Sequence, residues 1–64
     1  MKSYYVKLQY YWEPAKEWRY VDYIKEAGYK TYQEAEERCI VLNLELEDGG
    51  IYVERYVVGV EDDD

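Results

Sequence analysis

Histidine and phenylalanine are absent from this chain of 64 residues, and cysteine, proline, serine and threonine each occur once. The lack of histidine removes the commonest general base and the commonest metal ligand of proteins. Ser3 and Thr31 carry the only aliphatic hydroxyls, and neither has a base beside it in the sequence that would make it a nucleophile. We therefore expect no catalytic residue and no enzymatic activity.

The single cysteine, Cys39, cannot form an internal disulfide, and without histidine it cannot complete a zinc site. We expect it to pack in the core, where a free thiol behaves as a small apolar side chain. Two acidic segments, EDGG at residues 47–50 and EDDD at residues 61–64, lack the spaced ligands of a calcium loop. The sequence therefore predicts no metal site and no cofactor.

Long apolar runs are also missing, since no stretch approaches the roughly 18 consecutive apolar residues of a membrane span. No hydrophobic leader segment opens the chain. With one unpaired cysteine, these features predict a cytoplasmic protein that does not interact with membranes.

What the chain does contain is a strand-like alternation over residues 3–12. Pro14 follows it and suits the second position of a turn, so residues 18–25 are expected to return as the second strand of a hairpin. In this second strand we expect Val21 and Tyr23 to face the core. In the first strand, the alternation assigns Tyr4, Val6, Leu8, Tyr10 and Trp12 to the inner face and Tyr5, Lys7, Gln9 and Tyr11 to the outer face.

A helix is predicted to begin at Thr31, whose hydroxyl can accept a hydrogen bond from the amide of Glu34 while the Glu34 carboxylate reaches back to the Thr31 amide. The glycines at 49 and 50 signal its end, because glycine readily takes the left-handed conformation that closes a last turn. Spacings of three and four residues place one apolar stripe on this helix, formed by Tyr32, Ala35, Cys39, Leu42 and Leu46.

An alternative interpretation of residues 44–47 remains open, because LELE also alternates and could form a short strand. Residues 51–60 are the last predicted strand in either case, with a bulge expected at the charged pair Glu54 and Arg55. The predicted fold class is α+β, in the order β-β-α-β, with a three-stranded antiparallel sheet and one helix packed on one face. We expect a single compact domain over residues 1–60 and a frayed acidic tail over residues 61–64.

Charge is distributed unevenly along the chain. Residues 1–30 contain six basic and four acidic residues, a net charge of +2, whereas residues 31–64 contain two basic and eleven acidic residues, a net charge of −9. Helical spacing predicts a row of carboxylates on the solvent face of the helix, at a scale comparable with the phosphates of nucleic acid. The partner-binding acidic residues we expect are Glu34, Glu36, Glu37, Glu45, Glu47 and Asp48. Simple solubilisation of a small domain would explain the same residues.

In its size, acidity, abundance of tyrosine, β-β-α-β order and TYQEAEERC helix start, the chain resembles the short proteins by which bacteriophages and mobile elements inhibit host defence, anti-CRISPR proteins among them. The resemblance implies a non-enzymatic inhibitor that mimics nucleic acid and blocks a basic nucleic-acid-binding protein or complex of the host. It implies no direct binding of nucleic acid.

An alternative function places the contacts on the face of the sheet that a single helix leaves uncovered. Tyr5 and Tyr11 are expected there, and tyrosine is common at protein interfaces. This face could serve a small interaction module or a homodimer. A third possibility, a stacking platform for single-stranded nucleic acid, conflicts with the net charge of −7.

Overall fold

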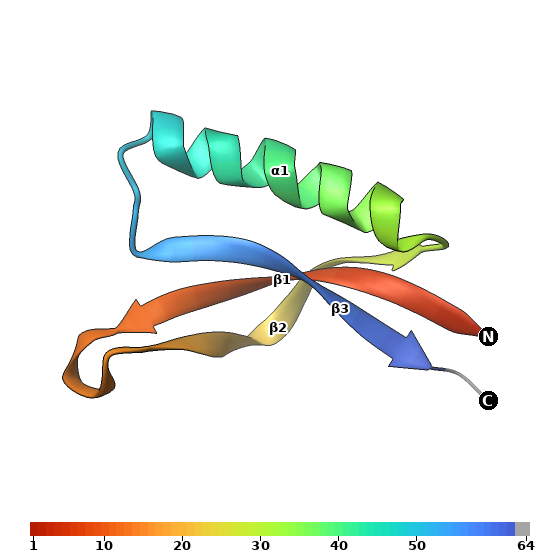
Figure 1. The fold of residues 1–64 in the computed structure, drawn as a ribbon, viewed down its shortest axis with the longest axis horizontal. Coiled ribbons are helices and arrows are strands. Elements are labelled where there is room, and N and C mark those ends of the chain that lie inside the picture. The colour runs from red at the N-terminus through yellow and green to blue at the C-terminus, as the bar shows by residue number, and fades with distance from the viewer. Residues whose placement is uncertain (63–64) are drawn as a thin grey trace.

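The computed structural model describes residues 1–62 of the chain. It contains strand β1 (Lys2–Trp12), a 3₁₀ turn (Glu13–Ala15), strand β2 (Glu17–Tyr29), helix α1 (Tyr32–Asp48) and strand β3 (Glu54–Asp62). Figure 1 shows the helix lying along one side of the sheet. The predicted α+β fold with β-β-α-β order and a three-stranded antiparallel sheet is confirmed.

β1 is the central strand of the sheet, which has the order β2-β1-β3. β1 and β3 pair without interruption from Lys2 opposite Asp62 to Tyr10 opposite Glu54. The bulge expected at Glu54 and Arg55 is therefore wrong, because regular pairing places these two residues on opposite faces. β3 also extends two residues beyond the predicted boundary at 60. Of the expected frayed tail, residues 61 and 62 belong to β3, while 63 and 64 lie outside the described residues.

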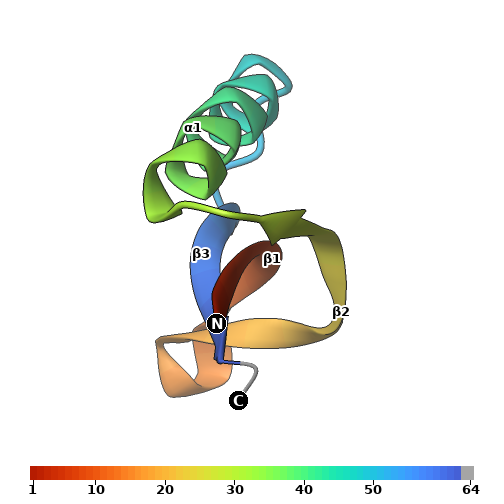
Figure 2. The ribbon, with the colours of Figure 1, turned by 90° about the vertical axis from the view of Figure 1, so that its right-hand side faces the viewer.

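β2 bends sharply, because it contains more residues than the stretch of β1 that it faces. Between the pairs Tyr4–Tyr29 and Gln9–Tyr20, β1 advances from 4 to 9 while β2 spans 20 to 29, with register shifts along the way. Extra residues on one strand kink it and increase its twist. Figure 2 shows the result, with β2 curving away from β1 and then returning toward α1. Tyr23 lies in this bend and is 58% exposed, so the expectation that it faces the core is wrong.

The hairpin turns at Pro14 as the sequence predicts. The amide of Lys16 donates to the Glu13 carbonyl at 3.1 Å, and Lys16 takes a left-handed conformation with φ of 51°. This conformation lets Trp12, the last residue of β1, pair directly with Glu17, the first residue of β2.

The core lies between α1 and the face of the sheet that carries Val6, whose exposed fraction is 0%. Val6 packs with Ala35, Cys39 and Leu42 of the helix. Burial raises the pKa of the Cys39 thiol, which disfavours the reactive thiolate. Around this cluster lie the half-buried side chains of Tyr4, Tyr29, Tyr56 and Val58. The core is thus small and is completed by aromatic rings.

Not every residue of β1 follows the predicted alternation. Leu8 is buried as expected, but Trp12 is exposed near the hairpin turn. Gln9, predicted to face outward, is buried because Arg55 from β3 covers it and donates from Nε to Oε1 of Gln9 at 2.7 Å. The strand therefore buries side chains on both faces.

Both ends of α1 are closed by local hydrogen bonds. The Glu34 amide donates to Oγ1 of Thr31 at 3.2 Å, as predicted, whereas the Thr31 hydroxyl and not its amide donates to the Glu34 carboxylate, at 3.1 Å. At the other end, the amides of Gly50 and Ile51 donate to the carbonyls of Glu47 and Leu46, at 3.0 and 2.9 Å. This is a Schellman motif, with Gly50 at φ of 75°. Residues 44–47 are therefore helical, and the alternative strand is excluded.

Candidate functional site: the outer face of the helix

The six acidic residues singled out by the sequence all lie on α1 and are all exposed. Within residues 1–62, the ion pairs are Arg19 with Glu17 and Arg38 with Glu26. None of the six helical carboxylates belongs to either pair. Their negative charge is therefore not neutralised by direct contact with a basic side chain in the described part of the protein.

The six carboxylates of the predicted row fall into two groups along α1. Glu37 is the last residue of the N-terminal group, which also contains Glu34 and Glu36, and Glu45 is the first of the C-terminal group, which also contains Glu47 and Asp48. At 1.5 Å of rise per residue, about 12 Å of helix separates Glu37 from Glu45. A partner would therefore meet two acidic patches on one rigid element.

Apolar side chains occupy the helix surface between these two groups. Ile40, Val41 and Leu44 are 52%, 46% and 55% exposed. Leu44 lies three residues after Val41 and four after Ile40, so the three side chains are neighbours on the helix surface. They point away from the sheet, since Cys39 and Leu42 are the residues that enter the core. We call Ile40, Val41 and Leu44 the outer triad.

Sequence reasoning missed the outer triad although a signal was present. The segment CIVLNL at residues 39–44 contains more apolar residues than a single stripe can accommodate at helical spacing. Of the predicted stripe, Ala35, Cys39 and Leu42 are buried as expected, whereas Tyr32 in the first turn is 52% exposed. The remaining apolar residues of the segment must then face outward among the carboxylates.

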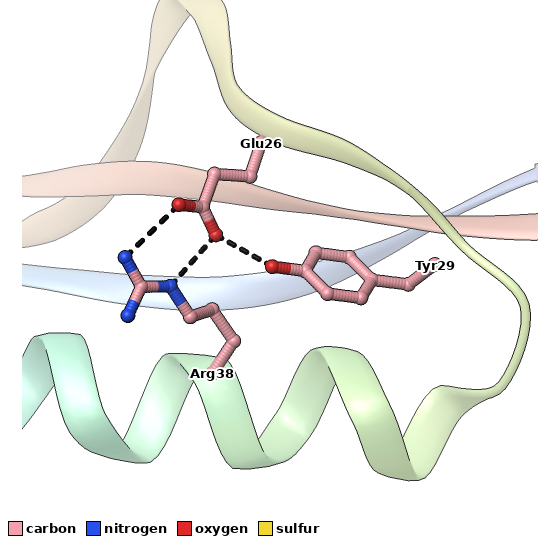
Figure 3. Close-up of polar contacts among 3 residues, drawn as sticks. All are labelled: Glu26, Tyr29 and Arg38. Carbon is pink, nitrogen blue, oxygen red and sulfur yellow. Dashed lines mark hydrogen bonds and ion pairs between the residues drawn. The ribbon is translucent and has the colours of Figure 1, made fainter.

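A half-buried ion pair between Arg38 and Glu26 holds α1 against β2 (Figure 3). Arg38 donates from Nε and from a terminal nitrogen to the two carboxylate oxygens of Glu26, at 2.8 and 3.0 Å, and the Tyr29 hydroxyl donates to the same carboxylate at 2.6 Å. The hydrogen bonds from Arg38 and then Tyr29 lower the pKa of Glu26, while this carboxylate raises the pKa of Tyr29. Two-pronged arginine–carboxylate contacts fix orientation as well as distance. They therefore help to fix the direction in which the outer face points.

Asn43 ties the helix to β3. Its side chain accepts a hydrogen bond from the Tyr56 amide at 2.7 Å and donates one to the Tyr56 carbonyl at 3.1 Å. Because β3 is an edge strand, these two backbone groups point away from the sheet and would otherwise lack a partner strand. The sequence contains no local signal for this contact, which depends on how the helix lies over the strand.

Tyr5 and Tyr11 lie on the other face of the sheet and do not meet the helical carboxylates. Both are half-buried by contacts within the protein. The Tyr5 ring lies against Gly59 of β3, and the Tyr11 ring packs edge-on against Trp18 with 5.5 Å between ring centroids. The Arg55 guanidinium lies over the Trp18 ring, 4.1 Å from the ring centroid. These two tyrosines therefore pack among the side chains that cover the face of the sheet opposite α1, which we call the open face.

Two further findings concern metal ions and membranes. In residues 1–62, no three cysteine or acidic side chains come together in a way that could hold a metal ion. Across the same residues, no helix is long and apolar enough to cross a membrane. Comparison of the chain with protein-family models, with curated proteins and with solved structures finds no match.

Proposed function

We propose that this protein is a non-enzymatic binding protein that presents the outer face of α1 to a basic surface of a partner protein, where it takes the place of nucleic acid. The observation that carries the proposal is that six exposed carboxylates on one helix make no ion pair within residues 1–62. Charges gathered on one face and left unpaired raise the rate of encounter with an oppositely charged surface.

The setting that agrees with this function is the cytoplasm of a bacterial host, with the protein supplied by a phage or mobile element. Its target would be a protein or complex of a defence system that binds DNA or RNA through lysine and arginine side chains. Because the two acidic patches are separated along the helix axis, they suit a partner groove that has basic residues at two places along its length.

The experiment is a pull-down from bacterial lysate, followed by displacement of the captured protein with duplex DNA and, separately, with RNA. The test variant carries Glu37→Lys, Glu45→Lys and Glu47→Lys. Glu34 is left in place because it hydrogen-bonds with Thr31 at the start of the helix. We expect the variant to retain its helical circular dichroism and to lose the partner.

A matched control reverses three exposed acidic residues outside the helix, Glu13, Asp22 and Glu61. Each reversal adds two charge units to the net charge of −7, so both triple variants have a formal net charge of −1. The control should capture the partner as the wild type does. Equal loss in both variants would mean that net charge alone drives binding, and equal retention would mean that the helix is not the contact surface. Either result refutes the proposal, as does capture that neither DNA nor RNA can displace.

A further inference from the structure

The outer triad gives the partner surface a second property besides positive charge. We propose that α1 docks in a groove of the partner protein that has an apolar floor for Ile40, Val41 and Leu44 and basic residues along its borders. This inference rests on the proposed function and deepens it, because it names the chemistry of the site that the helix occupies.

Single exposed apolar residues are common on protein surfaces and need no explanation. Here three of them adjoin one another on a helix, and each is exposed over about half of its surface. Spacings of three and four residues on one rigid helix are the pattern by which an amphipathic helix enters an apolar groove. A surface made only of lysine and arginine would leave these side chains in contact with water or with charged groups.

Charge decides which occupant covers the triad. If a second copy of the chain docked through the same face, the carboxylates around one triad would lie against those around the other. Glu37 and Glu45 are the nearest members of the two acidic groups and have no ion pair in the described residues. Like charges brought together at an interface cost free energy and select against that pairing. The same repulsion applies to nucleic acid and to anionic lipid, so a basic protein groove is the occupant that satisfies both the charges and the apolar side chains.

The test uses a defined probe, a synthetic amphipathic helix of about 14 residues, or four turns, with leucine on one face and lysine on the other. A second peptide has serine in place of each leucine and the same charge. Binding to the intact protein is measured by calorimetry at about 0.15 M salt, where interactions between distant exposed charges are screened. Amide shifts in NMR spectra of the wild type locate the contact without any substitution. We expect shifts at Ile40, Val41 and Leu44 with the leucine peptide only.

The variant Ile40→Ser/Leu44→Ser should bind the leucine peptide at least about tenfold more weakly, because it lacks two large apolar side chains that would be buried against the peptide. The matched control is Val53→Ser/Val60→Ser, which removes apolar side chains outside α1 that are 60% and 52% exposed. The control should bind as the wild type does. Circular dichroism checks that both variants keep their helix.

Each of the other outcomes overturns the inference. Unchanged binding by Ile40→Ser/Leu44→Ser, or equal binding of the two peptides, would show that charge alone is recognised. Sedimentation that reveals a wild-type dimer, absent in the same variant, would make a second copy the occupant. The proposed function fails separately, by the outcomes of the pull-down given above, such as partner binding that survives the charge reversal at Glu37, Glu45 and Glu47.

Discussion

Replacing Gly59 with alanine should destabilise the protein only while Tyr5 is present. A Cβ atom at position 59 would overlap the Tyr5 ring, which lies directly over this glycine. Carbon atoms pack at about 3.5–4.0 Å, so the ring must move away from its place on the sheet. Forced displacement of a packed side chain costs about 1–3 kcal/mol of unfolding free energy.

In a Tyr5→Ala background the same substitution should have the opposite sign. Gly59 has an ordinary strand conformation, with no positive φ. Without the ring above it, alanine is better than glycine in a strand by about 0.5–1 kcal/mol, because glycine loses more conformational entropy on folding. The entropy term is the same in both backgrounds and cancels, so the displacement of the Tyr5 ring alone predicts a coupling of about 1–3 kcal/mol between positions 5 and 59.

Urea unfolding of the wild type, the two single variants and the double variant measures this coupling, with tryptophan fluorescence as the signal. Gly50→Ala is the control, because Gly50 has φ of 75° and no atom near the added Cβ. It should cost about 1–2 kcal/mol whether or not Tyr5 is present. If Gly59→Ala has the same effect in both backgrounds, the assignment of Tyr5 to an intramolecular contact on the open face is wrong.

Two further predictions concern the contacts that hold the helix on the sheet. Asn43→Leu removes both hydrogen bonds to the Tyr56 backbone and should lower the unfolding free energy by about 1–3 kcal/mol. Asn43→Asp should lose less, because its carboxylate can still accept a hydrogen bond from the Tyr56 amide. Equal stability of the wild type and both variants in urea would contradict this prediction. Stability from Glu26, whose folded pKa is lowered below 4.5 by Arg38 and Tyr29, should be fully present above about pH 4.5 and should be lost as the pH falls through the lower folded value. The unfolding free energy of Glu26→Gln should therefore fall less steeply than that of the wild type over this acidic range, and parallel pH curves would refute the role of the pair.

The element order was predictable because the sequence changes period where the structure changes element. Alternation over residues 3–12 and helical spacing after Thr31 are both clear, and the local hydrogen bonds at the helix ends need only a few neighbouring residues. The buried residues Val6, Cys39 and Leu42 followed from the same two periods.

What escaped prediction depends on contacts between distant segments. The bend in β2 arises from mismatched lengths in the pairing with β1, which no local pattern in this aromatic strand reveals. Gln9 is buried because Arg55 reaches it from β3, 46 residues away. The pair of Glu26 and Arg38 forms only because the bend returns β2 to the helix.

The candidate site was predictable in its charges and not in its pattern. The helical carboxylates could be predicted to be exposed, because none of them belongs to the apolar stripe that faces the sheet. The outer triad does not follow from the apolar stripe, because the stripe accounts only for the apolar residues that enter the core. The triad occupies the helix surface between the two groups of carboxylates.

The most direct test of the central claim is an NMR titration of the isotope-labelled protein with the partner captured from lysate. We expect the amide signals shifted by the partner to belong to the outer face of α1, from Glu36 and Glu37 through the outer triad to Glu47. We expect little change at Tyr5 and Tyr11. Shifts concentrated at those two tyrosines, with the helix signals unmoved, would contradict the account and assign binding to the open face of the sheet.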